Sequence, residues 1–116
     1  MVESFEEIVE LSLLFDFYGE MLGEHKKQIF EDYVLNDLSL AEIAEEKGIS
    51  RQGVHDIVKR CTKQLKEYET TLHLVEKFLA IKEKVEQVNV LLEKEDSDNK
   101  LVQEIRQITG EIIEEL

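Results

Sequence analysis

The sequence predicts an all-α protein with a helix-turn-helix head, a long helix and a C-terminal helical hairpin arm. Proline is absent and only five glycines occur in 116 residues, so obligate helix breakers are missing. Apolar residues recur at steps of three and four, whereas the alternation of a strand is not found. Residues 39–60 carry the caps and glycine of a helix-turn-helix. We expect a helix-turn-helix domain at residues 1–75 and an arm at residues 76–116.

The first two predicted helices supply an aromatic core for the head. Ser4 and Glu7 form a capping box for a helix that runs to about Leu22, where Gly23 ends it. A second helix follows over residues 24–35. The aromatic side chains on these helices are best explained as core packing rather than as a ligand site; they are Phe15, Phe17, Tyr18, Phe30 and Tyr33.

The helix-turn-helix is predicted from a series of local signals. Ser39 is a good N-cap, and Glu42 three residues later completes a capping box. Gly48 suits the turn because glycine adopts positive φ without strain, and Ser50 caps the next helix. The predicted buried faces consist of Leu40, Ile43 and Ala44 on the first helix, and Val54, Ile57 and Val58 on the second.

The outward face of the second helix holds the candidate DNA contacts. Arg51, Gln52 and His55 are predicted to contact bases, since arginine pairs with guanine and glutamine with adenine in bidentate fashion. Ser39, at the start of the first helix, offers backbone amides to a phosphate. The remaining phosphate contacts are predicted at Lys59, Arg60, Lys63 and Lys66.

The segment SLAEIAEEKGISRQGVHDIVKR at residues 39–60 resembles region 4 of the sigma-70 family. With LLFDFYGEML upstream and its length, the chain resembles more closely the YlxM-type family over residues 11–75. These are small bacterial proteins encoded beside the signal recognition particle genes. The resemblance implies a winged helix-like DNA-binding superfamily member that regulates transcription, with a link to that particle. It carries over Arg51 and Arg60, whereas Asp56 and Gly53 argue against strong promoter binding.

Charge is distributed unevenly along this acidic chain. The net charge is −13. Residues 1–38 carry −8, residues 39–66 carry +2 and residues 67–116 carry −7. A basic window at the helix-turn-helix favours a polyanion partner there, while the acidic remainder opposes the approach of a duplex. We therefore expect double-stranded DNA to bind weakly or with assistance.

The second helix of the helix-turn-helix is predicted to continue as a heptad seam. The seam consists of Val54, Val58, Cys61, Leu65, Tyr68, Leu72, Val75 and Leu79. A new register then takes over with Phe78, Ile81, Val85, Val88 and Leu92, so we expect a bend, a break or a change of packing partner near residues 78–82.

The arm is predicted to end in a helical hairpin. A polar turn is expected at residues 95–99, before a last helix whose stripe is Leu101, Ile105, Ile108 and Ile112, widened by Val102, Ile113 and Leu116. A two-helix arm cannot bury both of its stripes alone and must pack on the head or on a second subunit, so we expect a homodimer formed through the arm.

Other classes of protein are disfavoured by the sequence. No signal peptide or apolar run of membrane-spanning length is found, and the single Cys61 cannot form an internal disulfide, which favours the cytoplasm. The scattered histidines lack metal-site spacing, and no phosphate-binding glycine motif occurs. We expect no cofactor, no metal and no enzymatic activity.

Two functions remain open at this point. One is a DNA-binding regulator of the sigma region 4 type. The other is an interaction adaptor in which the helix-turn-helix is a stable scaffold, and in which the basic strip or the acidic arm contacts a signal recognition particle protein or RNA.

Overall fold

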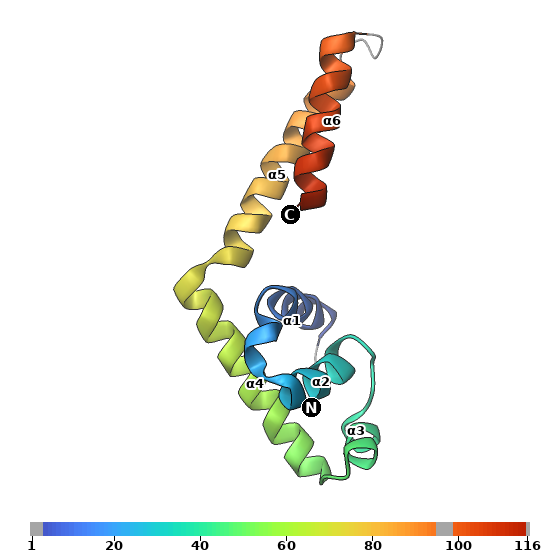
Figure 1. Cartoon of the computed structure of the whole chain (residues 1–116), viewed down its shortest axis with the longest axis vertical. Coiled ribbons are helices and arrows are strands. Elements are labelled where there is room, and N and C mark those ends of the chain that lie inside the picture. The colour runs from blue at the N-terminus through green and yellow to red at the C-terminus, as the bar shows by residue number, and fades with distance from the viewer. Residues whose placement is uncertain (1–3, 95–98, 116) are drawn as a thin grey trace. The chain divides into compact units, whose positions relative to one another are not determined.

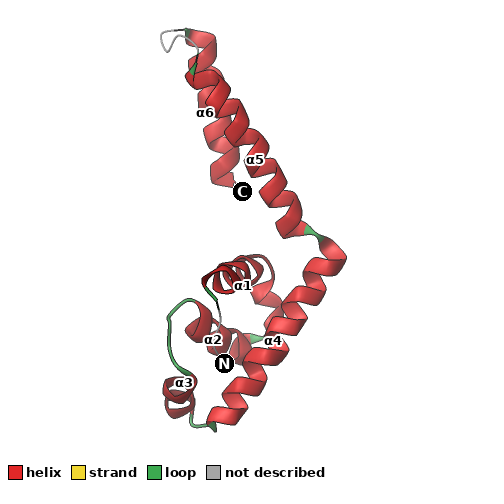
Figure 2. Ribbon diagram, turned by 180° about the vertical axis from the view of Figure 1, so that it is seen from behind, coloured by secondary structure: helices red, strands yellow, loops and turns green. Residues whose placement is uncertain are grey.

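The computed structural model describes residues 4–94 and 99–115, and all its elements are helices (Figures 1 and 2). They are α1 (Phe5–Tyr18), the 3₁₀ helix η1 (Gly19–Leu22), α2 (Glu24–Val34), α3 (Leu40–Lys47), α4 (Arg51–Leu72), α5 (Leu74–Glu93) and α6 (Lys100–Glu115). The predicted all-α class is confirmed, because the described residues contain no strand. The chain divides into two compact units, residues 1–75 and 76–116. Within the described part, none of the helices combines the length and the apolar character needed to cross a membrane.

The first unit begins with a capped helix that tightens at its end. The Oγ of Ser4 accepts a hydrogen bond from the Glu7 amide at 3.1 Å, so Ser4 is the N-cap of α1, but the reciprocal bond of the predicted capping box is not found in the described residues. The predicted helix to Leu22 is α-helical only to Tyr18 and continues as η1. A Cβ on Gly19 would lie 2.9 Å from the Phe15 ring, so glycine allows that ring to pack against the backbone.

The core of this unit is formed by α4 and the three helices around it, which Figure 1 shows on one side of α4. Phe15, Tyr18 and Phe30 are buried, and Phe15 stacks on Phe30 with ring centroids 5.8 Å apart. The predicted aromatic core is confirmed, with Phe17 and Tyr33 packed at its margin. The buried stripe of α4 consists of Val54, Val58, Cys61 and Leu65. Burial raises the pKa of the Cys61 thiol.

The prediction that the seam of α4 continues to Leu79 is wrong. Helix α4 ends at Leu72, and His73 adopts the left-handed conformation with φ of 56°, which is earlier than the expected break at residues 78–82. Leu72 and Leu79 are 42% and 45% exposed. The physical reason is that side chains take over the backbone amides that follow His73, so the helix can stop there.

The side chains that take over these amides are Tyr18 and Glu69. The Tyr18 hydroxyl donates to Glu69 Oε1 at 2.6 Å and accepts from the Leu74 amide at 3.2 Å. The same Oε1 accepts from the Val75 amide at 3.0 Å. Burial, followed by the hydrogen bond to Glu69, raises the pKa of Tyr18. These contacts tie α1 to the end of α4.

The second unit is an antiparallel pair, α5 and α6, which lie side by side in both views (Figures 1 and 2). Arg106 Nη2 donates to the Leu92 carbonyl oxygen at 2.7 Å. The Thr109 hydroxyl lies 2.6 Å from Asn89 Oδ1 and donates to it. The expected turn at 95–99 falls mostly on residues 95–98, which lie outside the described residues.

The predicted inner stripe of α6 is partly wrong. Val102 and Thr109 are buried, whereas Leu101, Ile108 and Ile112 are 63%, 56% and 37% exposed. Ile105 and Ile113 are half-buried. The inner face is rotated by about one residue because it contains the polar pair of Thr109 with Asn89, and a hydrogen-bonded polar pair can occupy a buried position. Ile81 and Val88 of the register predicted for α5 are likewise exposed, at 45% and 38%.

The contact between α1 and the end of α4 yields a stability prediction. Tyr18→Phe removes a hydrogen bond to a carboxylate and leaves the Leu74 amide without this acceptor. We expect the free energy of unfolding of the first unit to fall by about 1.5–3 kcal/mol, measured by urea denaturation. Tyr68→Phe is the matched control, since its hydroxyl accepts only a neutral amide bond from Gln64 at 2.6 Å. That loss should be smaller, about 0.5–1.5 kcal/mol. Equal losses in the two variants would contradict the assigned role of Glu69.

Candidate nucleic-acid interface

The candidate interface starts at the first helix of the helix-turn-helix, α3. The Ser39 Oγ accepts from the Glu42 amide at 3.1 Å, and Glu42 Oε1 accepts from the Ser39 amide at 3.2 Å. The predicted capping box is therefore present. Its carboxylate occupies the amide of Ser39 and places negative charge at this helix end, which weakens the predicted phosphate contact at Ser39.

The turn between α3 and α4 is built as its residues predict. Gly48 adopts φ of 69° and ψ of 31°, and its amide donates to the Ala44 carbonyl oxygen. The Ile49 amide donates to the same oxygen at 3.1 Å, while the Ile49 side chain packs against the core. The Ser50 Oγ then accepts from the Gly53 amide at 2.9 Å and starts α4. This turn fixes the direction in which α4 leaves α3.

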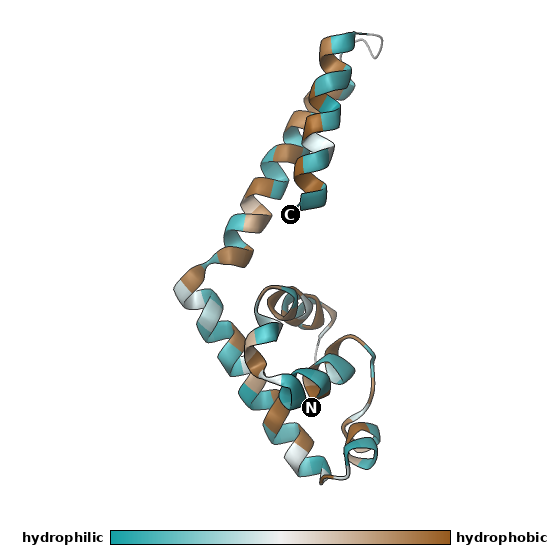
Figure 3. Ribbon diagram, viewed as in Figure 1, coloured by the Kyte–Doolittle hydropathy of each residue, from teal (hydrophilic) through white to brown (hydrophobic). Residues whose placement is uncertain are grey.

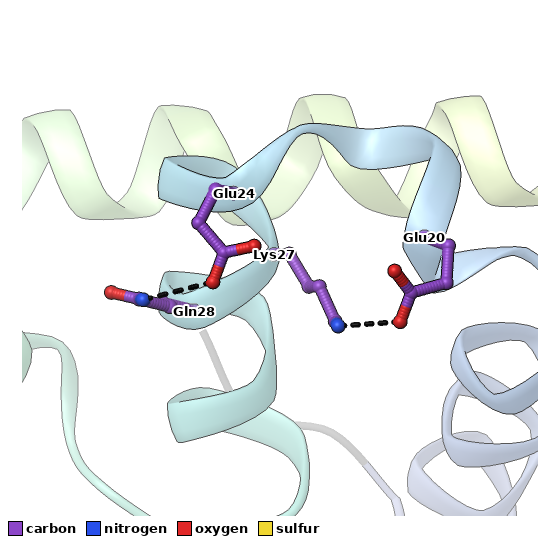
Figure 4. A network of polar contacts seen from close by, with 4 residues as sticks. All are labelled: Glu20, Glu24, Lys27 and Gln28. Carbon is purple, nitrogen blue, oxygen red and sulfur yellow. Dashed lines mark hydrogen bonds and ion pairs between the residues drawn. The ribbon is translucent and has the colours of Figure 1, made fainter.

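Helix α2 makes side-chain contacts with η1 and with α3, and the contact with η1 is shown in Figure 4. Lys27 Nζ lies 2.5 Å from Glu20 Oε1, and Gln28 Nε2 donates to Glu24 Oε1 at 3.1 Å. This contact with Glu20 raises the pKa of Lys27. Gln28 also accepts from Lys47 Nζ at 3.2 Å, which joins α2 to the last turn of α3.

The predicted base contacts lie together beside the start of α3. Arg51, Gln52 and His55 line a hollow of about 320 Å³ with Leu40. Arg51 and Gln52 are exposed, and His55 is half-buried. Because Val54 and Val58 face the core, the helical repeat directs these side chains away from it. The three residues are therefore placed where one ligand can contact them all.

His55 has an unusual environment within this hollow. Its Nδ1 is buried, has no hydrogen-bond partner in the described part of the chain and lies 3.6 Å from Asp56 Oδ1. The side chain is still 32% exposed. A buried ring nitrogen without a hydrogen bond costs about 1–3 kcal/mol. Because Nδ1 is buried, only the exposed part of the ring is open to a ligand in the hollow.

Gln52 has a partner that the sequence analysis did not predict. Gln52 Nε2 donates to Asp56 Oδ1 at 3.1 Å across one turn of α4. The i,i+4 spacing of an amide and a carboxylate on one helix is the signal that would have identified this pair. The amide of a predicted base contact is thus already engaged, and Asp56 places negative charge at the centre of the interface.

The predicted phosphate contacts are only partly brought together. Lys59, Arg60 and Lys63 line a second hollow of about 390 Å³ on α4, together with Asp56. All of them are exposed. Lys66 is exposed about one turn further along α4 and does not line this hollow, nor does Ser39.

The first turn of α4 differs electrostatically from those of its neighbours in the head. α1 carries Glu6 and Glu7 there, α2 carries Glu24 and α3 carries Glu42. α4 carries no acidic residue there and begins with Arg51. A cation at a helix N-terminus is unfavourable by about 0.3–1 kcal/mol, because the helix dipole is positive at that end. This end of α4 therefore suits an anionic ligand.

The short helix α3, the left-handed glycine turn and the helix α4 with its exposed outer side define a helix-turn-helix protein. The family model described as "Putative helix-turn-helix protein, YlxM / p13 like" matches residues 5–108. The chain therefore belongs to this family, UPF0122, and the predicted YlxM-type relationship is confirmed.

Curated relatives support the same assignment. The chain is 37% identical over 112 residues to a UPF0122 protein of Thermoanaerobacter sp. (strain X514), covering 94% of this chain and 96% of that protein. It is 40% identical over 111 residues to one of Bacillus mycoides, covering 96% and 97%. It is 45% identical over 83 residues to one of Caldanaerobacter subterraneus, covering 72% and 71%.

The geometry of the turn yields a second prediction. Gly48→Ala places a Cβ at positive φ, so we expect the first unit to lose about 1–2 kcal/mol of unfolding free energy in urea. Gly48→Asn is the matched control, because asparagine tolerates the left-handed conformation better. The Gly48→Asn variant should keep most of the stability that the Gly48→Ala variant loses. A ranking in which asparagine is the worse residue would contradict the role given to φ.

Proposed function

We propose that this protein is a DNA-binding regulator whose helix α4 enters the major groove as the recognition helix of a sigma-70 region 4-like helix-turn-helix. The observation that carries this proposal is the placement of Arg51, Gln52 and His55 around one hollow at the N-terminus of α4. The absence of an acidic residue in that turn supports it. Recognition helices contact base edges with their N-terminal residues, which is where these side chains lie.

Each group of residues has its own role in the proposed complex. Arg51 and Gln52 contact base edges, and His55 supplies a third contact. Lys59, Arg60 and Lys63 neutralise phosphates from their shared hollow and set the position of the helix without specifying a sequence. Lys66 extends the phosphate contacts at the margin, and the start of α3 at Ser39 adds only a weak contact, because Glu42 occupies the Ser39 amide. No cofactor or catalytic group has a role in this proposal.

The proposed DNA binding is weak for one chain alone. The net charge of −13 opposes a polyanion, although charges further than ~8 Å from the duplex are largely screened at physiological salt. Two linked heads would offset this weakness, since a second contact on the same duplex is intramolecular. We therefore include in the proposal a homodimer formed by the helical arm, acting in the cytoplasm.

A second candidate function is favoured by the contact between Gln52 and Asp56. That contact engages a base-contacting amide and lowers the positive charge of the recognition helix. In this alternative the helix-turn-helix is the scaffold of an adaptor for the signal recognition particle, with a protein or RNA of that particle as partner. The family resemblance supports that partner, and the acidic balance of the chain suits a basic surface.

A comparison of two variants tests the regulator. Arg51→Ala should remove about 1–3 kcal/mol from binding to preferred duplexes and leave other duplexes nearly unchanged. Lys63→Ala should weaken binding to all duplexes alike. It should also reduce the slope of the logarithm of the binding constant against the logarithm of the salt concentration by about one. Fluorescence anisotropy of labelled genomic fragments at two salt concentrations measures both effects.

The same titration separates the two candidate functions. Absence of binding by the unmodified protein at low salt would exclude the regulator and favour the adaptor. Binding that neither variant changes would place the DNA contact on another surface.

The contact at Asp56 yields a separate prediction. Asp56→Ala removes a negative charge from the recognition helix and releases the Gln52 amide, so DNA affinity should rise by about 1 kcal/mol, or roughly fivefold. Asp16→Ala is the control, because it makes the same change in net charge at an exposed position on α1. The DNA affinity of the Asp16→Ala variant should change much less. Equal gains in both variants would show that only net charge matters, and that the Gln52 contact has no specific role.

A further inference from the structure

The hairpin of α5 and α6 leaves apolar side chains exposed on both of its helices. Those that share one side are Ile81 and Val88 on α5, and Leu101, Ile108 and Ile112 on α6, while Leu79, Val90 and Leu91 are exposed elsewhere on α5. Exposed fractions run from 37% at Ile112 to 63% at Leu101. Figure 3 shows hydrophobic residues recurring along the length of both helices.

The helical repeat places all five side chains on the same face of the hairpin. The inner side of α5 is marked by Asn89 and that of α6 by Thr109, which touch each other. At 100° per residue, Val88 lies one step back from Asn89, and Ile108 lies one step back from Thr109. Rotation in the same sense on two antiparallel helices leads to the same face of the pair. We name this surface, formed by the five residues, the apolar face.

The opposite face of the hairpin is mostly polar, although the helical repeat also places the exposed Leu79 and Val90 of α5 there. Asn89, Glu93 and Arg106 line a hollow of about 300 Å³ there, and Arg106 donates to the Leu92 carbonyl oxygen. The hairpin is thus amphipathic as a unit, with one mostly polar face and one apolar face. This is the pattern of half a four-helix bundle, in which two hairpins cover each other.

The size of the apolar face fits a partner of equal size. α6 has 16 residues and is therefore about 24 Å long. With two helices each ~10 Å wide, the face covers roughly 500 Å². Two such faces together bury about 1,000 Å², which is near the lower limit for a specific interface.

The charges at the edges of the apolar face complement one another. On the α5 side, the next exposed residues outward are Lys77 and Lys84. On the α6 side, Glu104 and Glu115 take this place. One edge is basic and the other is acidic. A second copy related by a two-fold axis parallel to the helices therefore places its acidic edge against the basic edge of the first copy, and its basic edge against the acidic one.

We propose that the apolar face binds a second copy of this chain, forming a two-fold four-helix bundle in which α5 of one copy lies beside α6 of the other. This inference rests on the dimer included in the proposed function and specifies its surface and arrangement. Asn89 lies opposite Thr109, so Lys84, five residues earlier on α5, is level with residue 114 of an antiparallel α6. A two-fold rotation about an axis parallel to the helices leaves the height of each residue along that axis unchanged. Lys84 therefore pairs with Glu115 of the second copy.

A substitution on the apolar face tests the proposal with the full chain. Ile108→Glu places an unpaired charge in the interface, and we expect the dimer dissociation constant, measured by sedimentation equilibrium, to rise about a hundredfold or more. Val90→Glu is the matched control, since Val90 is 52% exposed and lies outside the apolar face. It should leave the constant unchanged. Far-UV circular dichroism verifies that both variants keep their helix content.

A charge exchange tests the arrangement of the helices. Lys84→Glu should weaken the dimer by up to about fivefold, and addition of Glu115→Lys should restore it. A monomer at all concentrations, or a dimer unaffected by Ile108→Glu, would overturn the proposal. An unchanged constant in Lys84→Glu would overturn the pairing of α5 with α6. Sedimentation without DNA separates failure of the dimer from failure of DNA binding, which anisotropy measures.

Discussion

Burial of one face of α4 is the constraint on which the head depends. Val54, Val58, Cys61 and Leu65 are fully buried, and α1, α2 and α3 all pack around this helix. Removal of each such side chain from water stabilises the fold by about 1.5–3 kcal/mol. Since this stripe fixes which side of α4 faces inward, it also fixes which side faces out. The positions of Arg51, Gln52 and Lys59 follow from the core, and the interface needs no separate framework.

The head was predictable because its signals are local. Ser39, Glu42, Gly48 and Ser50 act on their own turns, so the capping box and left-handed turn of the structure are those the sequence implies. The break at His73 was not predictable from periodicity. It depends on Tyr18, which lies 51 residues from its acceptor Glu69 and supplies a hydrogen bond that no local pattern shows.

The arm and the interface show where sequence periodicity loses information. When apolar residues cover more than one stripe of a helix, more than one of its sides can face the neighbouring helix. On α6 the hydrogen bond of Thr109 with Asn89 determines which side faces α5. Arg51, Gln52 and His55 were placed together by the helical repeat, as their sequence spacing suggests. The contact of Gln52 with Asp56 was missed because exposed polar pairs have small energies and leave a weak signal.

The burial of Cys61 has an experimental use. It is the only cysteine of the chain, it is fully shielded among the core residues of α4, and its pKa is raised. Thiol reagents attack the ionised form, so modification in the native state requires that the core open first. The labelling rate of this one atom therefore measures how often the head opens. The chain carries its own probe of local unfolding, at the helix that is proposed to contact DNA.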